Sequence, residues 1–129
     1  MKRPLRQFVR ERADRRCEYC HIPDAAAPAA SFHVEHILAK QHGGVDAPPN
    51  RCWSCHRCNL RKGPNLSGRD PVTGKVVRLF NPRRQRWNRH FEWLGAILVG
   101  LTATGRATIA VLDINHPQRV QLRLEVGGF

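Results

Sequence analysis

The chain reads Cys17-Glu18-Tyr19-Cys20 near its start and Cys55-His56-Arg57-Cys58-Asn59 near its middle. Each stretch holds two cysteines with two residues between them, a spacing at which one tight turn presents both thiolates to one ion. Zinc prefers four such ligands in a tetrahedron, and two turns that are distant in sequence can supply them. The two pairs therefore predict one zinc site made by Cys17, Cys20, Cys55 and Cys58.

The fifth cysteine, Cys52, leaves an alternative open, because a pair shifted to Cys52 and Cys55 has the same spacing. We favour Cys55 with Cys58, which flank a better junction between a turn and a helix, and we expect Cys52 to be a small buried residue. A redox pair or chance spacing is the alternative to a metal site. Zinc held by four thiolates is coordinatively closed, so it would support the fold, and any chemistry needs a second site.

The composition points to a polyanionic partner. The chain has 129 residues and a formal net charge of +12, which exceeds what solubility requires. Lys and Arg outnumber Asp and Glu by 12 to 6 in residues 1–65 and by 10 to 4 in residues 66–129, so each half carries +6. The basic surface should therefore belong to the folded body and face phosphates; a generally solvated basic surface is the alternative.

The hydrophobic pattern predicts short elements around the cysteines. Before residue 65 we expect a helix over 4–16 that would place Arg6, Arg10 and Arg16 near the ligand, an irregular loop over 23–30, a strand over 31–37, turns over 41–50, and a helix over 56–62 ended by Gly63-Pro64. After Pro64 we expect strands over 75–80 and 97–101, a helix capped by Thr102 that runs to Leu112, and a helix over 117–126.

These residues resemble a known family. The stretches Phe32-His33-Val34-Glu35-His36-Ile37, Gln41-His42-Gly43-Gly44 and Cys55-His56-Arg57-Cys58-Asn59, together with Asn50, are similar to the HNH endonucleases, in the subset with two zinc knuckles. The resemblance covers residues 17–65 closely and is weaker beyond them. Arg51 departs from the leucine that usually follows the asparagine, and Asn59 replaces the last histidine of the motif, as is common in the family.

The resemblance implies a fold. It is an α+β class with a ββα-metal, treble-clef-like core, structural zinc and a small α/β C-terminal extension. In domain terms, residues 1–65 would be the nuclease core with its N-terminal helix, and residues 66–129 the extension packed on the same domain.

The resemblance also implies roles for single residues. His36 would be the general base that deprotonates the attacking water, and Asn50 would fix the loop that orients it. Glu35 and Asn59 would bind one catalytic Mg²⁺ or Mn²⁺ through oxygen, with His33 as a possible further ligand or a partner of the carboxylate. The products would carry a 5′-phosphate and a 3′-hydroxyl. Because consecutive residues of a strand face opposite sides, Glu35 and His36 can serve one phosphate only if the strand ends at this pair.

Basic side chains outside this pair are candidates for DNA contacts. Four arginines surround Trp87, and they suggest either a clamp on the DNA backbone or a buried tryptophan under a solvated arginine face. We expect a mixture, in which Trp87 is core and at least two arginines reach phosphates. The predicted DNA-binding set is Lys62, Arg83, Arg84, Arg86 and Arg89.

Three classes of function follow. The first is a metal-dependent endonuclease that cuts DNA with low sequence specificity; the second is a non-catalytic zinc-stabilised nucleic-acid-binding module; the third is a nuclease active only within a larger complex. We expect a cytoplasmic protein without a membrane partner, since the first 16 residues lack an apolar signal region and the apolar stretch over 94–110 is interrupted. A reducing compartment also favours metal-bound cysteines over disulfides.

Overall fold

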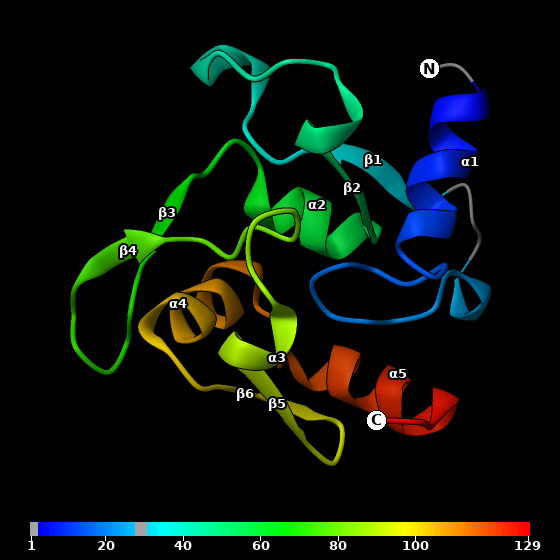
Figure 1. Ribbon diagram of the computed structural model, residues 1–129. Coiled ribbons are helices and arrows are strands. Elements are labelled where there is room, and N and C mark those ends of the chain that lie inside the picture. The colour runs from blue at the N-terminus through cyan, green and yellow to red at the C-terminus, as the bar shows by residue number, and fades with distance from the viewer. Residues whose placement is uncertain (1–2, 28–30) are drawn as a thin grey trace. The chain divides into compact units, whose positions relative to one another are not determined.

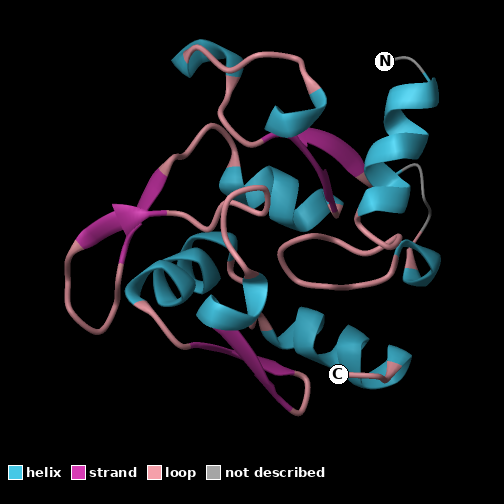
Figure 2. Cartoon of the chain, in the orientation of Figure 1, coloured by secondary structure: helices cyan, strands magenta, loops and turns pink. Residues whose placement is uncertain are grey.

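The computed structural model describes residues 3–27 and 31–129, so residues 28–30 of the expected loop lie outside the described part. The chain divides into two compact units, Met1–Pro64 and Asn65–Phe129, each built around its own elements (Figure 1). All three sheets of the described residues are two-stranded antiparallel hairpins, which Figure 2 shows in magenta. No helix in this part of the chain is long and apolar enough to cross a membrane.

The first unit is a hairpin flanked by helices. Its elements are α1 (Arg3–Arg12), η1 (Asp24–Ala26), β1 (His33–His36), η3 (Lys40–His42), η4 (Pro48–Asn50), β2 (Arg51–Ser54) and α2 (His56–Lys62). Strand β1 pairs with β2 so that Glu35 lies opposite Cys52 and His36 lies opposite Arg51. The order β1, β2, α2 is the ββα arrangement expected from the sequence.

Helix α1 ends four residues before the predicted limit. Asp14 and Arg15 adopt left-handed backbone angles, with φ of 55° and 58°, which stop the helical hydrogen-bond pattern. The core beneath α1 contains Val9, Phe32 and Trp53, all buried, and the Phe32 and Trp53 rings lie 5.4 Å apart. This core holds α1 against the hairpin that carries the candidate functional residues.

The second unit contains two hairpins and three helices among its described residues. They are β3 (Ser67–Arg69), β4 (Val76–Arg78), α3 (Trp87–His90), β5 (Phe91–Leu94), β6 (Ile97–Gly100), α4 (Ala103–Leu112) and α5 (Pro117–Val126). Helix α4 packs on β3, β4 and β6. Thr102 caps α4 as predicted, because its hydroxyl accepts a hydrogen bond from the Gly105 amide at 3.0 Å.

The sequence pattern predicts α4, α5, β6 and β4 but gives no sign of β3, β5 or α3. β4 and β6 are equally short but lie in apolar runs of the sequence, whereas β3, β5 and α3 lie in segments with no comparable apolar run. A close approach also shapes this unit: a Cβ on Gly105 would lie 2.1 Å from the His90 carbonyl oxygen, so only glycine fits there. The second unit is thus the small C-terminal extension of helices and strands that the family resemblance implied.

Candidate active site and zinc site

Four cysteine sulfurs converge in the first unit. Cys17 and Cys20 lie on a turn closed by the hydrogen bond from the His21 amide to the Cys17 carbonyl, and Cys55 caps α2, its sulfur accepting from the Cys58 amide at 3.4 Å. The four sulfurs lie within 4.8 Å of one another, and those of Cys20 and Cys55 are 3.8 Å apart.

This arrangement fits structural zinc. A tetrahedron with zinc–sulfur bonds of about 2.3 Å places its sulfurs about 3.8 Å apart, close to the separation of Cys20 from Cys55. Three of the four cysteines have almost no exposure, and Cys55 is nearly as buried. Cys52 does not join the cluster, so the shifted pair that the sequence left open is not formed.

Beside the hairpin lies a pocket of about 570 Å³. It brings together Glu35, His36 and Asn59, the three residues for which the family resemblance implies catalysis and cation binding. Two of them come from the end of β1 and one from α2. The remaining lining includes His33, Lys40, Ala39, Arg6 and the Gly63-Pro64 turn.

Glu35 faces the interior of the unit. Its side chain is almost completely buried, Cys52 Sγ lies 3.3 Å from Oε2, and Lys62 Nζ lies 3.7 Å from Oε1. Burial raises the pKa of Glu35 to about 7, against the opposing effects of Lys62, Cys52 and Tyr19. Oε1 makes no hydrogen bond among the described residues, and its ion pair is with the Lys62 ammonium.

Lys62 has a different environment from the one predicted. The sequence suggested a DNA contact, but the side chain is buried at 2% exposure and its ammonium donates to the Ile37 carbonyl at 3.1 Å. This position makes Lys62 the partner of Glu35 and of the backbone that follows β1. A phosphate on the surface would not meet it.

His36 faces away from Glu35. Its Nε2 lies 2.7 Å from Oδ1 of Asp46 and 3.1 Å from Nη1 of Arg51, whereas Glu35 contacts neither residue in the described part. The strand alternation expected from the sequence therefore persists to the last residue of β1. Both side chains still line the pocket because it lies at the end of the strand.

Asn50 ties the connecting loop together. Its Oδ1 accepts from the Leu38 amide at 2.8 Å, and its Nδ2 donates to the carbonyls of Leu38 and Val45 at 2.9 and 2.8 Å. The Ile37 amide also donates to the Asn50 carbonyl at 2.8 Å. One residue thus closes both ends of the loop that follows His36.

His33 contacts another histidine. Its Nε2 lies 3.1 Å from Nδ1 of His56, at the start of α2, and it also lines the pocket. This hydrogen bond is to a residue other than Glu35. The suggestion that His33 binds the catalytic cation or supports the carboxylate therefore stays a prediction.

The arginines of the N-terminal segment serve the fold. Arg10 pairs with Asp24 at 2.6 Å, Arg6 donates to the Phe32 carbonyl and stacks over Trp53, and Arg16 donates to the His21 carbonyl. The sequence predicted that all three arginines face a ligand. Arg10 and Arg16 instead make contacts within the unit. Of the three, Arg6 also lines the pocket.

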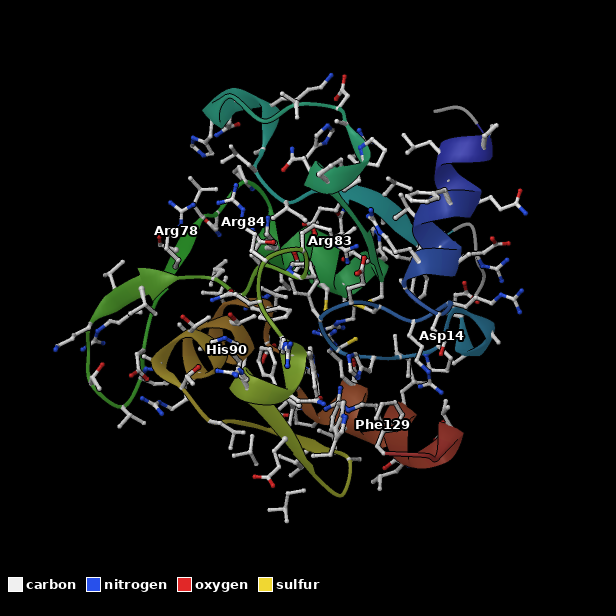
Figure 3. All side chains as sticks on the ribbon, in the orientation of Figure 1. Asp14, Arg78, Arg83, Arg84, His90 and Phe129 are labelled. Carbon is white, nitrogen blue, oxygen red and sulfur yellow. The ribbon has the colours of Figure 1, made fainter. Side chains whose placement is uncertain are left out.

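The arginines of the second unit are more accessible. Arg84, Arg86 and Arg89 are exposed, and Arg83 is half-buried. The backbone amides of Arg83 and Arg84 donate to Oδ1 of Asn81 and so place both arginines on one turn. Figure 3 labels their side chains. Trp87 is half-buried against Phe91 and Trp93, so the expectation that it is core is met only in part.

Comparison with known proteins agrees with the geometry of the first unit. Residues 17–65 match the model of the HNH endonuclease family. They form an HNH domain. The match begins at the first zinc cysteine and ends just after α2, so it contains the whole ββα arrangement and most of the pocket lining.

One curated relative extends further. Over 117 residues the chain is 28% identical to the Septu protein PtuB of Bacillus thuringiensis, a match that covers 85% of this chain and 40% of that protein. The chain thus spans about two fifths of the length of this relative. No solved structure matches significantly.

Asp46 and Arg51 contact His36 in the HNH domain. The sequence predicted no role for either residue. Asp46 falls in an expected turn, and Arg51 stands out only as a departure from the family pattern. Arg51 could have been found by asking which residue opposes His36 on a paired strand. Asp46 is brought to His36 by the loop that Asn50 closes, and no sequence spacing signals that contact.

Proposed function

We propose that this chain is a metal-dependent endonuclease that hydrolyses DNA phosphodiester bonds. The observation that carries the proposal is the pocket lined by Glu35, His36 and Asn59 in the HNH domain. An imidazole beside a carboxylate and an amide oxygen is the set of groups needed to activate water and to hold a hard cation. HNH proteins act on nucleic acids as a family, and the net charge of +12 supports such a substrate.

His36 is the general base in this proposal. Its side chain is 24% exposed, so it is open to a water molecule while its ring stays anchored by neighbouring groups. Asn50 holds the loop over 38–45 and thereby limits movement of the backbone that follows His36. Imidazole is the side chain whose ordinary pKa, about 6.5, suits proton uptake at neutral pH.

Glu35 and Asn59 are the proposed ligands of a catalytic Mg²⁺ or Mn²⁺. The buried Oε1 of Glu35 has no hydrogen-bond partner in the described residues, and it belongs to the same pocket as Asn59, so the oxygen donors fit a hard cation. When bound, such an ion would neutralise charge on the phosphate and on the leaving oxygen. Lys62 would then share the Glu35 carboxylate.

DNA would be held through its backbone. We infer that the exposed guanidinium groups of Arg84, Arg86 and Arg89, together with Arg83, contact phosphates, which is why we propose low sequence specificity. We also infer a reducing, cytoplasmic setting, since four of the five cysteines are arranged for a metal.

A non-catalytic nucleic-acid-binding module is the second candidate. It is favoured by the ion pair between Lys62 Nζ and Glu35 Oε1 at 3.7 Å. The ammonium balances the charge of the carboxylate, so no metal ion is needed there. A nuclease active only inside a larger assembly is a variant of the first proposal.

Cleavage of supercoiled plasmid by the purified, zinc-loaded chain tests the proposal. We expect nicking or linearisation with added Mg²⁺ or Mn²⁺ and none without added cation. His36→Ala should abolish the cleavage, and His42→Ala is the matched control because His42 is an exposed histidine of the same loop region. Salt-sensitive DNA binding with no cleavage by the unmodified chain would favour the binding module.

A further inference from the structure

Asp46 and Arg51 meet at one nitrogen of His36. Oδ1 of Asp46 lies 2.7 Å from Nε2, and Nη1 of Arg51 lies 3.1 Å from Nε2 and 3.5 Å from the same Oδ1. The second carboxylate oxygen of Asp46 is 3.4 Å from Nζ of Lys40. Within residues 3–27 and 31–129 no hydrogen bond is found to Nδ1 of His36, so all described polar contacts of the ring are on one side.

The shortest of these contacts, from Asp46 to Nε2, favours one tautomer of the neutral ring. A neutral imidazole carries its proton on one nitrogen only. If the proton is on Nε2, that nitrogen donates to Asp46 at 2.7 Å. Arg51 Nη1, 3.1 Å from Nε2, then makes no hydrogen bond to the ring and donates instead to the same carboxylate, at 3.5 Å. If the proton is on Nδ1, the bare lone pair of Nε2 lies 2.7 Å from a carboxylate oxygen, and two acceptors repel each other.

Asp46 is held as an acceptor by its surroundings. The pKa of Asp46 lies below its ordinary value, chiefly because His36 hydrogen-bonds to it and Lys40 adds a further hydrogen bond and positive charge. Arg51 is buried on β2, and its second amino group lies 3.5 Å from the Val34 carbonyl, so the guanidinium approaches the carboxylate from a paired strand. Asp46 itself lies on the surface loop at 63% exposure and does not line the pocket.

We propose that Asp46 is a positioning residue, which keeps the proton of His36 on Nε2 and leaves Nδ1 free to take the proton of the attacking water. This inference rests on the proposed function, in which His36 is the base. It assigns the protein a carboxylate–histidine pair in which the carboxylate touches neither the substrate nor the attacking water. Arg51, the residue that departs from the family pattern, orients the carboxylate.

Asparagine is the most informative replacement for Asp46. In Asp46→Asn, the new amide nitrogen can donate toward Nε2 of His36, and Arg51, which no longer faces a carboxylate, can donate to the same nitrogen from 3.1 Å. Two donors there favour the proton on Nδ1. The base would then carry a proton on the nitrogen that must accept one. The substitution preserves the size of the side chain, and the exposed position of Asp46 makes the folded state tolerant of it.

Steady-state cleavage kinetics are the first measurement. We expect Asp46→Asn to lower kcat by about 10²-fold, within the range that general-base catalysis contributes, with KM changed less than about two-fold. The matched control is Asp14→Asn, which removes the same charge at an exposed, left-handed position of the same unit where asparagine is well tolerated. Equal kcat for the two variants would overturn the inference.

The tautomer can be observed directly by ¹⁵N NMR of the zinc-loaded full chain, at a pH high enough that the His36 signals no longer change with pH. We expect the neutral His36 ring to be protonated on Nε2 in the unmodified protein and to shift toward Nδ1 in Asp46→Asn. A ring protonated on Nδ1 in the unmodified protein would refute the positioning role, even if the protein cuts DNA.

The two proposals fail in different ways. If the unmodified chain and His36→Ala are equally inactive with added cation, the proposal that this chain cuts DNA on its own fails, whatever tautomer the NMR spectrum shows. If the unmodified chain cuts DNA and Asp46→Asn retains both the rate and the Nε2 tautomer, the nuclease proposal survives and the role of Asp46 is wrong.

Discussion

Replacing Glu35 by glutamine should flatten the pH dependence of stability of the first unit. Burial raises the pKa of Glu35 to about 7 from its ordinary value of 4.5. Between these two values the folded state holds a proton that the unfolded state has released, so the free energy of unfolding falls as pH rises. Glutamine has nearly the same shape and no proton to release, so the variant lacks this loss.

The magnitude follows from the two pKa values. A difference of one in pKa corresponds to about 1.36 kcal/mol, so the full loss, as pH rises from below 4.5 to above 7, is about 3 kcal/mol. Cysteine ligands release zinc in acid, which sets a lower limit for a useful experiment. Between about pH 5.5 and about pH 8, ionisation of Glu35 should lower the free energy of unfolding by about 2 kcal/mol.

Urea unfolding of the zinc-loaded chain, without added Mg²⁺ and at several pH values, measures this effect. We expect the difference in unfolding free energy between Glu35→Gln and the unmodified protein to shift by about 2 kcal/mol across that range in favour of the variant. Glu11→Gln, at an exposed position of α1, is the control and should follow the unmodified protein. Parallel curves for Glu35→Gln and the unmodified protein would refute the buried, proton-binding carboxylate.

The remaining predictions concern zinc, DNA and the second unit. Cys17→Ser should lose the zinc and lower the melting temperature, whereas Cys52→Ser should keep one zinc per chain by metal analysis; zinc retained in the first variant would disprove the four-cysteine site. Removing charge at Arg83 and Arg84 should reduce the slope of log affinity for DNA against log salt by about 2, and an unchanged slope would reject the clamp. Thr102→Ala should cost about 1 kcal/mol in unfolding free energy, because the cap of α4 is lost, while Thr102→Ser should cost less; equal losses would contradict a hydroxyl cap.

Most of the longer local elements follow from the sequence alone. The helix over 56–62 and its end at Gly63 follow from a polar pattern closed by a glycine, and the helix capped by Thr102 follows from one hydroxyl before an apolar run. Both signals depend on neighbours within a few residues. The elements β3, β5 and α3 could not be predicted, because their own residues carry no clear pattern; β3 and β5 are strands through their pairing with β4 and β6.

The candidate site divides in the same way. The cysteine spacing indicated the metal ligands because the two residues between each pair determine one turn, and the family motif singled out Glu35, His36, Asn50 and Asn59. The burial of Lys62 was missed because a lysine in a polar helix gives no sign of a carboxylate beneath it. The internal pairing of Arg10 was missed for the same reason, since its partner lies 14 residues away.

The sequence by itself determined the chemistry available to this protein: four thiolates for zinc, one histidine beside one acidic residue, and a strongly basic composition. Tertiary structure alone decided which groups meet. Pairing of β1 with β2 set Arg51 opposite His36, and the closed loop brought Asp46 to within 2.7 Å of the same ring. The physical reason is that covalent neighbours determine turns and helices, whereas hydrogen-bond partners distant in the chain are chosen by the packing that brings them together.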